Sequence, residues 1–233
     1  MKAAHSRSDA DPQTLRISID TKAKIKLGEF SRGGQLRCRE PVKALDHEMQ
    51  ASEILVPLGI LEVKQKQFNI VYGNSRETSD FIVDGLEHWW RYRNNNYRDI
   101  RLLQIDLDNG PEIESHRTQF IKRMVEFSDA IQLPIELVYY PPYHGKYNPV
   151  EHCWGVLESH WSGALLMDID VVREWTKTMR WAGIAPNVYF LDKKYERGVR
   201  LSSRELRPYS ERLRRTPLID RWSLVIDPIK LAG

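Results

Sequence analysis

The sequence is poor in cysteine and has no long apolar run. Its 233 residues include only 2 cysteines, Cys38 and Cys153, which lack the spacing of a metal-binding cluster or a disulfide framework. No stretch is apolar for long enough to cross a bilayer, and no secretory leader is recognisable. These absences predict a cytoplasmic protein with reduced thiols and no membrane partner.

The sequence also lacks a strong excess of charge of either sign. The 35 Lys and Arg residues nearly balance the 32 Asp and Glu residues, which leaves a net charge of +3. Such a balance is compatible with nucleic-acid binding but does not argue for it. Internal repeats and an obvious linker are absent as well, so the length allows one large domain or two small ones.

Hydrophobic periodicity predicts an alternation of strands and helices. A strand ends at Asp20, a second strand over 22–30 forms a hairpin with it, and the stretch 36–58 is mostly irregular. Short strands follow at 59–63 and 67–72, and then come a helix from 79 to 93, a strand at 100–107, a helix at 115–130, a strand at 135–140, and helices at 149–161 and 170–180. This order predicts a mixed α/β sheet with helices on both faces.

Three regions are predicted from composition along the chain. Residues 1–13 are polar and are predicted to be disordered. Residues 14–185 form the α/β domain, and residues 186–233, which are rich in arginine, form a basic extension packed on this domain or following it.

A rigid aromatic loop comes before the helix at 149–161. Two consecutive prolines end the preceding strand, because neither can donate a hydrogen bond to a sheet. Asn148 is a good N-cap and Pro149 suits the first helical position, so Glu151 falls in the first helical turn. A carboxylate there interacts well with the helix dipole, and capping alone would explain it.

Three acidic positions stand where strands end or helices begin. Asp20 ends the first strand, Asp106 and Asp108 end the strand at 100–107, and Glu151 opens the later helix. Strand ends bring distant residues together in an open α/β sheet, and clustered carboxylates repel one another unless a cation is bound. Oxygen ligands favour Mg²⁺ or Mn²⁺, and two such ions can support an in-line phosphoryl displacement.

Each of these positions also has a simpler explanation. Asp108 begins an Asp-Asn-Gly turn, and Asp20 can be an ordinary acid of a strand-end turn. Asp106 alternates with Asp108, so both point to one face, and one of them can serve only as support. Lys22 and Lys24 belong to a basic face that is either solvated or a track for DNA.

Four stretches resemble one family. Residues 140–154 (YPPYHGKYNPVEHCW) resemble the PPY-S-x-x-NP-IE-x-x-W signature of DDE transposases in the IS630/Tc1-mariner group, and more closely the ISAzo13-type insertion-sequence transposases. Residues 17–24 (ISIDTKAK), 77–81 (ETSDF) and 105–112 (IDLDNGPE) match the same family. The similarity runs from about residue 13 to about residue 228.

The resemblance implies an RNase H-like catalytic domain that acts on DNA. By position, Asp20, Asp108 and Glu151 are the catalytic triad and the ligands of Mg²⁺ or Mn²⁺, with two ions expected. The implied reaction nicks the terminal repeats of an insertion sequence and joins the 3′-hydroxyl to target DNA. Gly145 replaces the expected Ser and His152 replaces a basic residue, but neither departure removes a ligand.

Further expectations follow from the same resemblance. Supporting roles near the triad are predicted for Asp106, Asn109, His144 and Asn148, and DNA contacts for Lys22, Lys24 and Lys146. A homodimer is one candidate assembly. Family members carry a helix-turn-helix region before the catalytic domain, and the lack of one here predicts an N-terminally truncated transposase. The alternatives are a non-catalytic nucleic-acid-binding remnant and another RNase H-like nuclease.

Overall fold

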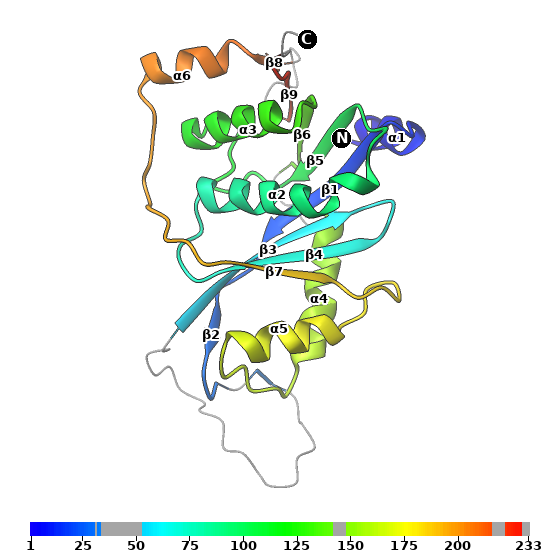
Figure 1. Ribbon diagram of the computed structural model, residues 1–233, viewed down its shortest axis with the longest axis vertical. Coiled ribbons are helices and arrows are strands. Elements are labelled where there is room, and N and C mark those ends of the chain that lie inside the picture. Colours follow the sequence, from blue (N-terminus) through cyan, green and yellow to red (C-terminus); the bar gives the residue numbers. More distant parts are fainter. Residues whose placement is uncertain (31, 34–52, 142–147, 216–221, 230–233) are drawn as a thin grey trace, which may run out of the picture.

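The computed structural model describes residues 1–30, 32–33, 53–141, 148–215 and 222–229. Within these residues one mixed sheet has the strand order β7-β4-β3-β1-β5-β6-β9-β8, and β2 adds to it by pairing with β3 (Figure 1). The strands are β1 Thr14–Thr21, β2 Ile25–Leu27, β3 Glu53–Glu62, β4 Gln67–Gly73, β5 Leu102–Leu107, β6 Ile135–Tyr139, β7 Asn187–Leu191, β8 Leu213–Arg215 and β9 Ser223–Ile226.

The centre of the sheet combines parallel and antiparallel pairs. β1, β5 and β6 run parallel to one another, while β3 is antiparallel to both β1 and β4. Parallel neighbours need a crossover, and α2 and α3 supply helices between successive strands. The predicted mixed α/β sheet is therefore confirmed.

Four of the six α-helices in the described residues begin and end close to the positions that periodicity indicates, whereas the first and the last were not placed by the sequence. They are α1 Lys2–Ala10, α2 Ser79–Arg93, α3 Thr118–Ile131, α4 Pro149–Trp161, α5 Ile169–Thr178 and α6 Ser203–Ser210, with a short 3-10 turn η1 at Asn94–Asn96. Thr78 caps α2, because its hydroxyl accepts a hydrogen bond from the backbone N–H of Phe81 at 3.2 Å. None of the described helices is long and apolar enough to span a membrane.

The two faces of the sheet bury separate hydrophobic cores. On one face, α2 and α3 pack against β1, β5 and β6, with Ile17, Trp89 and Phe120 among the buried side chains. On the other face, α4 and α5 pack against β3 and β4, with Trp154 and Phe68 buried between them. Alternation along each strand produces this division, since successive side chains point to opposite faces. The helices thus cover both faces, as predicted.

The N-terminal segment forms a helix, contrary to the expectation of disorder for residues 1–13. α1 lies against β1 and makes polar contacts with side chains of β1, β5 and β6. Arg7 forms an ion pair with Glu136 at 2.7 Å, His5 Nε2 lies 3.2 Å from Asp106, and Ser8 donates a hydrogen bond to Gln104. Polar composition suggested disorder because this helix has no apolar face, yet the sheet offers it buried polar partners.

The predicted hairpin at the start of the sheet is wrong. β2 spans only three residues and pairs with β3, in the register Ile25↔Leu55, rather than with β1. Lys22 and Lys24 therefore lie in the connection between β1 and β2 and not on a strand face. The stretch predicted to be irregular is only partly observed: residues 34–52 lie outside the described ones, and β3 already begins at Glu53.

The C-terminal residues, expected as a basic extension from 186 onward, complete both edges of the sheet. β7 pairs with β4 in parallel, and β9 pairs with β6 and β8 in antiparallel fashion. A long connection, which is orange in Figure 1, links β7 to α6 past the ends of α2 and α3. Without β7 and β9, the backbone N–H and C=O groups along one side of β4 and of β6 would lack partners. The arginine-rich composition of this segment did not indicate that it would form these strands.

Candidate active site

Two of the predicted acids meet at the ends of neighbouring strands. β1 and β5 run parallel in the register Ser18↔Asp106, so Asp20 and Asp108 stand two positions further along the same edge. Side chains two residues apart on a strand share a face, which places both carboxylates on the side of the sheet that α4 covers.

The third acid is delivered by the first turn of α4, which is anchored directly on β1. Glu151 is the third residue of this helix, after Pro149 at its start. The side chain of Asn148 occupies the N-cap position but does not cap the helix. Instead, Ser18 donates a hydrogen bond to Asn148 Oδ1, and Asn148 Nδ2 donates to the Ile19 carbonyl at 3.3 Å.

The hydroxyl of Ser18 takes over the capping role. It accepts a hydrogen bond from the backbone N–H of Val150 at 3.2 Å, and both Ser18 and Asn148 are fully buried. The helix start is therefore fixed to the strand at a point two residues before Asp20. The sequence placed Asn148 correctly at the N-cap position. It did not show that Ser18 would cap the helix, because Ser18 lies on a strand far away in the sequence.

A tryptophan from α4 reaches the first acid. Trp154 Nε1 donates a hydrogen bond to Asp20 Oδ2 at 3.1 Å, and its ring packs edge-on against Phe68. Gly59 on β3 lies directly opposite Asp20 in the sheet register. A Cβ atom at Gly59 would stand 2.6 Å from Cζ2 of Trp154, so the missing side chain makes the space that the indole fills.

The three carboxylates disfavour one another's ionisation. Burial, followed by the charges of Asp108 and Glu151, raises the pKa of Asp20 to about 7. Burial raises the pKa of Asp108, and burial together with Asp108 raises the pKa of Glu151, although His152 and Lys22 act in the opposite direction there. The negative charge of this cluster is thus incompletely compensated within the described residues.

The donor chemistry fits a hard divalent cation. All three side chains offer carboxylate oxygens, which Mg²⁺ and Mn²⁺ prefer. Asp108 Oδ1 is buried without a hydrogen-bond partner among the described residues, and the same is true of the hydroxyl of Tyr140 at the end of β6. Still, no group of three or more His, Cys, Asp or Glu side chains in the described part of the chain is arranged as a ready set of metal ligands.

Asp106 lies in a different environment from Asp108. It is fully buried, and its carboxylate accepts hydrogen bonds from Arg16 Nη1 at 3.0 Å and from Gln104 Nε2 at 2.7 Å. His5 Nε2 is a further neighbour at 3.2 Å. Asp106 therefore takes part in contacts that hold β1, β5 and α1 together, whereas Asp108 Oδ1 has no hydrogen-bond partner among the described residues.

An open pocket of about 330 Å³ adjoins the cluster. Asp20, Glu151 and Trp154 contribute to its wall, and Lys22 lies at its border in an ion pair with Glu158 at 2.7 Å. Of the other residues predicted to surround the triad, Lys24 and Asn109 are exposed and Asn148 is fully buried, while His144 and Lys146 are outside the described residues.

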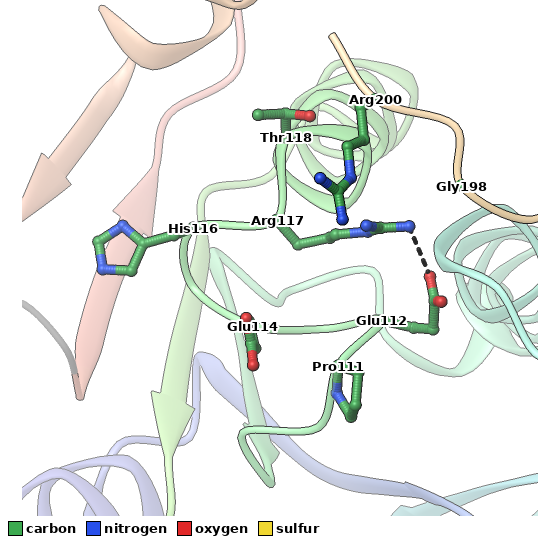
Figure 2. A pocket seen from close by; sticks show the side chains of 8 residues that line it. All are labelled: Pro111, Glu112, Glu114, His116, Arg117, Thr118, Gly198 and Arg200. Atoms are coloured by element: carbon green, nitrogen blue, oxygen red, sulfur yellow. Dashed lines mark hydrogen bonds and ion pairs between the residues drawn. The ribbon is translucent and has the colours of Figure 1, made fainter.

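A larger pocket of about 540 Å³ lies beyond the loop that follows Asp108, near the start of α3 (Figure 2). Arg117 and Arg200 contribute basic groups to it, and Glu112 and Glu114 contribute acidic ones. Glu112 accepts hydrogen bonds from Arg117 at 3.1 Å and from the backbone N–H of Ser79 at 3.3 Å, so it joins the starts of α2 and α3. This arrangement explains packing and points to no particular ligand.

Sequence reasoning missed the residues that contact and position the predicted acids. Ser18 stands two positions before Asp20 and so shares its face, and Trp154 stands one helical turn after Glu151. Both spacings are visible in the sequence and could have indicated that these side chains lie near the acids. The role of Gly59 was not, because it depends on the pairing of β3 with β1.

Comparisons with known proteins identify the family of the chain. A family model described as "Rhodopirellula transposase DDE domain" matches residues 1–228. The chain belongs to this family. The match confirms the resemblance predicted from the motifs and extends it to the first residue. No curated protein matches the chain.

Solved structures support the fold of this DDE transposase domain. The "Mos1 transposase paired-end complex with left transposon end" matches with a TM-score of 0.52 and 10% identity, over 75% of this chain and 50% of that chain. The "crystal structure of a pre-cleavage Mos1 transpososome" matches with a TM-score of 0.50 and 8% identity, over 75% of this chain and 51% of that chain. The fold is RNase H-like, as predicted. The chain spans about half the length of these two relatives.

Proposed function

We propose that this domain is the catalytic part of a DNA transposase, in which Asp20, Asp108 and Glu151 bind Mg²⁺ or Mn²⁺ and support strand cleavage and strand transfer at insertion-sequence ends. Membership of a transposase DDE family and the RNase H-like fold support the reaction class. DDE transposases generally use divalent metals. Two ions are the expected complement.

The observation that carries this proposal is the uncompensated acidic cluster at the ends of β1 and β5. Burial and the two neighbouring acids raise the pKa of Asp20 to about 7. The three acids repel one another, and Asp20 and Glu151 line an open pocket from which a cation can approach them. Strongly perturbed acids in a cleft are typical of functional sites.

Each residue has a distinct role in the proposed site. Asp20 and Asp108 present carboxylates from rigid strand ends, and Glu151 presents a third from a helix that Ser18 anchors on β1. Bound divalent ions would activate a water or 3′-hydroxyl and stabilise the leaving oxygen. Asp106 and Asn148 hold the backbone that carries these groups, through Arg16 and Ser18 respectively.

The proposed partner is DNA, with terminal repeats and a target segment as substrates. Lys22 borders the pocket beside the cluster and Lys24 is exposed nearby, so both can contact backbone phosphates that approach the metal ions. Binding through such contacts weakens as salt rises.

Metal binding tests the site directly. The experiment titrates Mn²⁺ into the metal-free chain by calorimetry and compares Asp108→Asn with Asp106→Asn. Asp108→Asn is expected to weaken binding at least about 10-fold, because loss of a residue that only orients a ligand already costs about 10- to 100-fold. Asp106→Asn is the matched control: it should lower stability while leaving Mn²⁺ affinity close to that of the wild type, because Asp106 is engaged by Arg16. The reverse pattern would move the second ligand to Asp106.

A strand-transfer assay tests the reaction. The substrate is a duplex that carries the element's own terminal repeats, with Mn²⁺ present, and Glu151→Gln is compared with the wild type. Loss of cleavage and joining in Glu151→Gln is the expected result. Unchanged cleavage in this variant would contradict the triad, and a wild-type chain that binds DNA but neither binds Mn²⁺ nor cuts would favour a non-catalytic DNA-binding protein.

A further inference from the structure

Two tryptophans on α4 share a helix and a core but differ in one bond. Trp154 and Trp161 are each 3% exposed and belong to the same hydrophobic cluster. The indole N–H of Trp154 donates to Asp20 Oδ2 at 3.1 Å. The indole N–H of Trp161 is buried and has no hydrogen-bond partner among the described residues. Trp161 packs in the core with the Arg32 guanidinium 5.9 Å from its ring centroid, whereas Trp154 makes a directed hydrogen bond to an acid of the cluster.

The space around Trp154 is shaped so that its N–H reaches the carboxylate. Gly59 stands opposite Asp20 in the antiparallel register of β1 and β3. Any side chain there would collide with the indole, since a Cβ would lie 2.6 Å from Trp154 Cζ2 and 3.0 Å from Val150 Cγ2. Phe68 packs edge-on against the indole, with ring centroids 5.3 Å apart. The ring is thereby held in one position.

We propose that Trp154 is a positioning residue of the metal site, which fixes the orientation of the Asp20 carboxylate by holding Oδ2. This inference rests on the proposed function, because it takes Asp20 as a ligand. Ligating carboxylates are commonly oriented by hydrogen bonds from groups that do not touch the metal, and the loss of such a bond costs about 10- to 100-fold in metal affinity.

The hydrogen bond from Trp154 to Asp20 also connects α4, which carries Glu151, with β1, which carries Asp20. Trp154 lies one turn after Glu151 on α4, and Ser18 fixes the start of the same helix on β1. The helix is thus tied to β1 at two points, one on each side of Glu151. Asp20 and Glu151 cannot move apart without breaking one of these contacts.

The test compares Trp154→Phe with Trp161→Phe. Each change removes the indole N–H and the same ring volume from the same core, so loss of packing affects both. Mn²⁺ affinity, measured by calorimetry on the full chain, should fall about 10-fold or more in Trp154→Phe and stay near the wild-type value in Trp161→Phe. Equal affinities in the two variants would overturn the inference.

A spectroscopic measurement of metal binding is made on the unmodified protein and uses the two variants only to assign resonances. The ¹H–¹⁵N spectrum should show an indole resonance for each of the 7 tryptophans. The resonance that is absent from Trp154→Phe should move when Mg²⁺ is added to the wild type, and the one absent from Trp161→Phe should not. A Trp154 resonance that is insensitive to Mg²⁺ while the protein binds the ion would contradict the proposed role.

Asp20→Asn separates this inference from the function on which it rests. If this variant loses Mn²⁺ binding while Trp154→Phe behaves like Trp161→Phe, the metal site stands and only the role of Trp154 is wrong. If Asp20→Asn binds Mn²⁺ as the wild type does, Asp20 is not a ligand, and both the site and the inference are wrong.

Discussion

Two acidic residues on neighbouring strands, Glu62 and Asp20, are treated in opposite ways by the fold. Glu62 at the end of β3 is fully buried, and Arg93 binds it through two nitrogens, at 2.8 and 2.7 Å. It also accepts hydrogen bonds from Trp89, Tyr97 and Asn69. Asp20 at the end of β1 receives a side-chain hydrogen bond from Trp154 and has two further acids nearby.

The difference separates a structural acid from a proposed functional one. A buried carboxylate is tolerated where a guanidinium and several donors replace its water. Glu62 has all of these, and in return it raises the pKa of Arg93. At Asp20 a bound cation would supply the missing charge. Glu62 is fully buried and Asp20 is half-buried, but the clearer difference between the two sites is the charge of their neighbours.

The largest predicted effect lies at the compensated acid. Glu62→Ala should lower the free energy of unfolding by about 3–5 kcal/mol, because Arg93 would be left without its buried partner. Urea denaturation measures this loss. Glu174→Ala is the control, since its pair with Lys177 is exposed and should contribute little to stability. Similar losses in both variants would remove the contrast between buried and exposed pairs.

The second prediction concerns the dependence of stability on pH without metal. The unfolded chain releases the Asp20 proton near pH 3.8 and the folded chain near pH 7, so ionisation in this window destabilises the folded state. Relative to Asp20→Asn, the wild type should lose stability as pH rises through the window, by about 2–4 kcal/mol in total. Urea denaturation in EDTA between pH 4 and pH 8 measures it, and parallel curves for the two proteins would contradict the raised pKa.

A smaller effect is expected at the anchor between β1 and α4. Ser18→Ala should cost about 1–3 kcal/mol, because the buried N–H of Val150 and the side chain of Asn148 would lose a partner. Thermal unfolding measures this change. Ser159→Ala on the exposed side of α4 is the matched control, with an expected change within about 0.5 kcal/mol. Equal changes would show that the anchor adds nothing beyond an ordinary surface hydroxyl.

The smallest predicted effect is on DNA binding by a lysine that lies outside the acidic cluster. Lys24→Ala should weaken DNA binding modestly and reduce the salt dependence of the binding constant by up to about one unit of log–log slope. Fluorescence anisotropy over a range of salt concentrations measures the slope. Lys64→Ala, an exposed lysine in the turn between β3 and β4, should leave the slope unchanged. A loss that is equal at both lysines would mean that the region around Lys24 is not a DNA track.

The sequence was most informative where structure is local. The bounds of α2 follow from apolar spacing, and those of α4 from an N-cap position at Asn148 and a proline at the first helical position. The acids Asp20, Asp108 and Glu151 could be singled out because each stands at the end of a predicted element. Their roles as metal ligands stay a prediction.

Features that depend on distant partners could not be predicted in this way. The polar helix α1 shows no apolar pattern, since its partners are Gln104, Asp106 and Glu136 on the sheet. β2 was assigned to the wrong neighbour, because a three-residue strand carries too little pattern to specify its pairing.

The sequence by itself determined the family, the mixed α/β class and the acids that stand at strand and helix ends, because these are written in short motifs and local periodicity. Only the tertiary structure decided which acids are neutralised. Asp106 contacts Arg16, and Glu62 contacts Arg93. By contrast, burial raises the pKa of Asp20, Asp108 and Glu151, and neighbouring acids raise the pKa of Asp20 and Glu151 further. The physical reason is that a carboxylate's environment is set by side chains far away in sequence, which the strand register brings together.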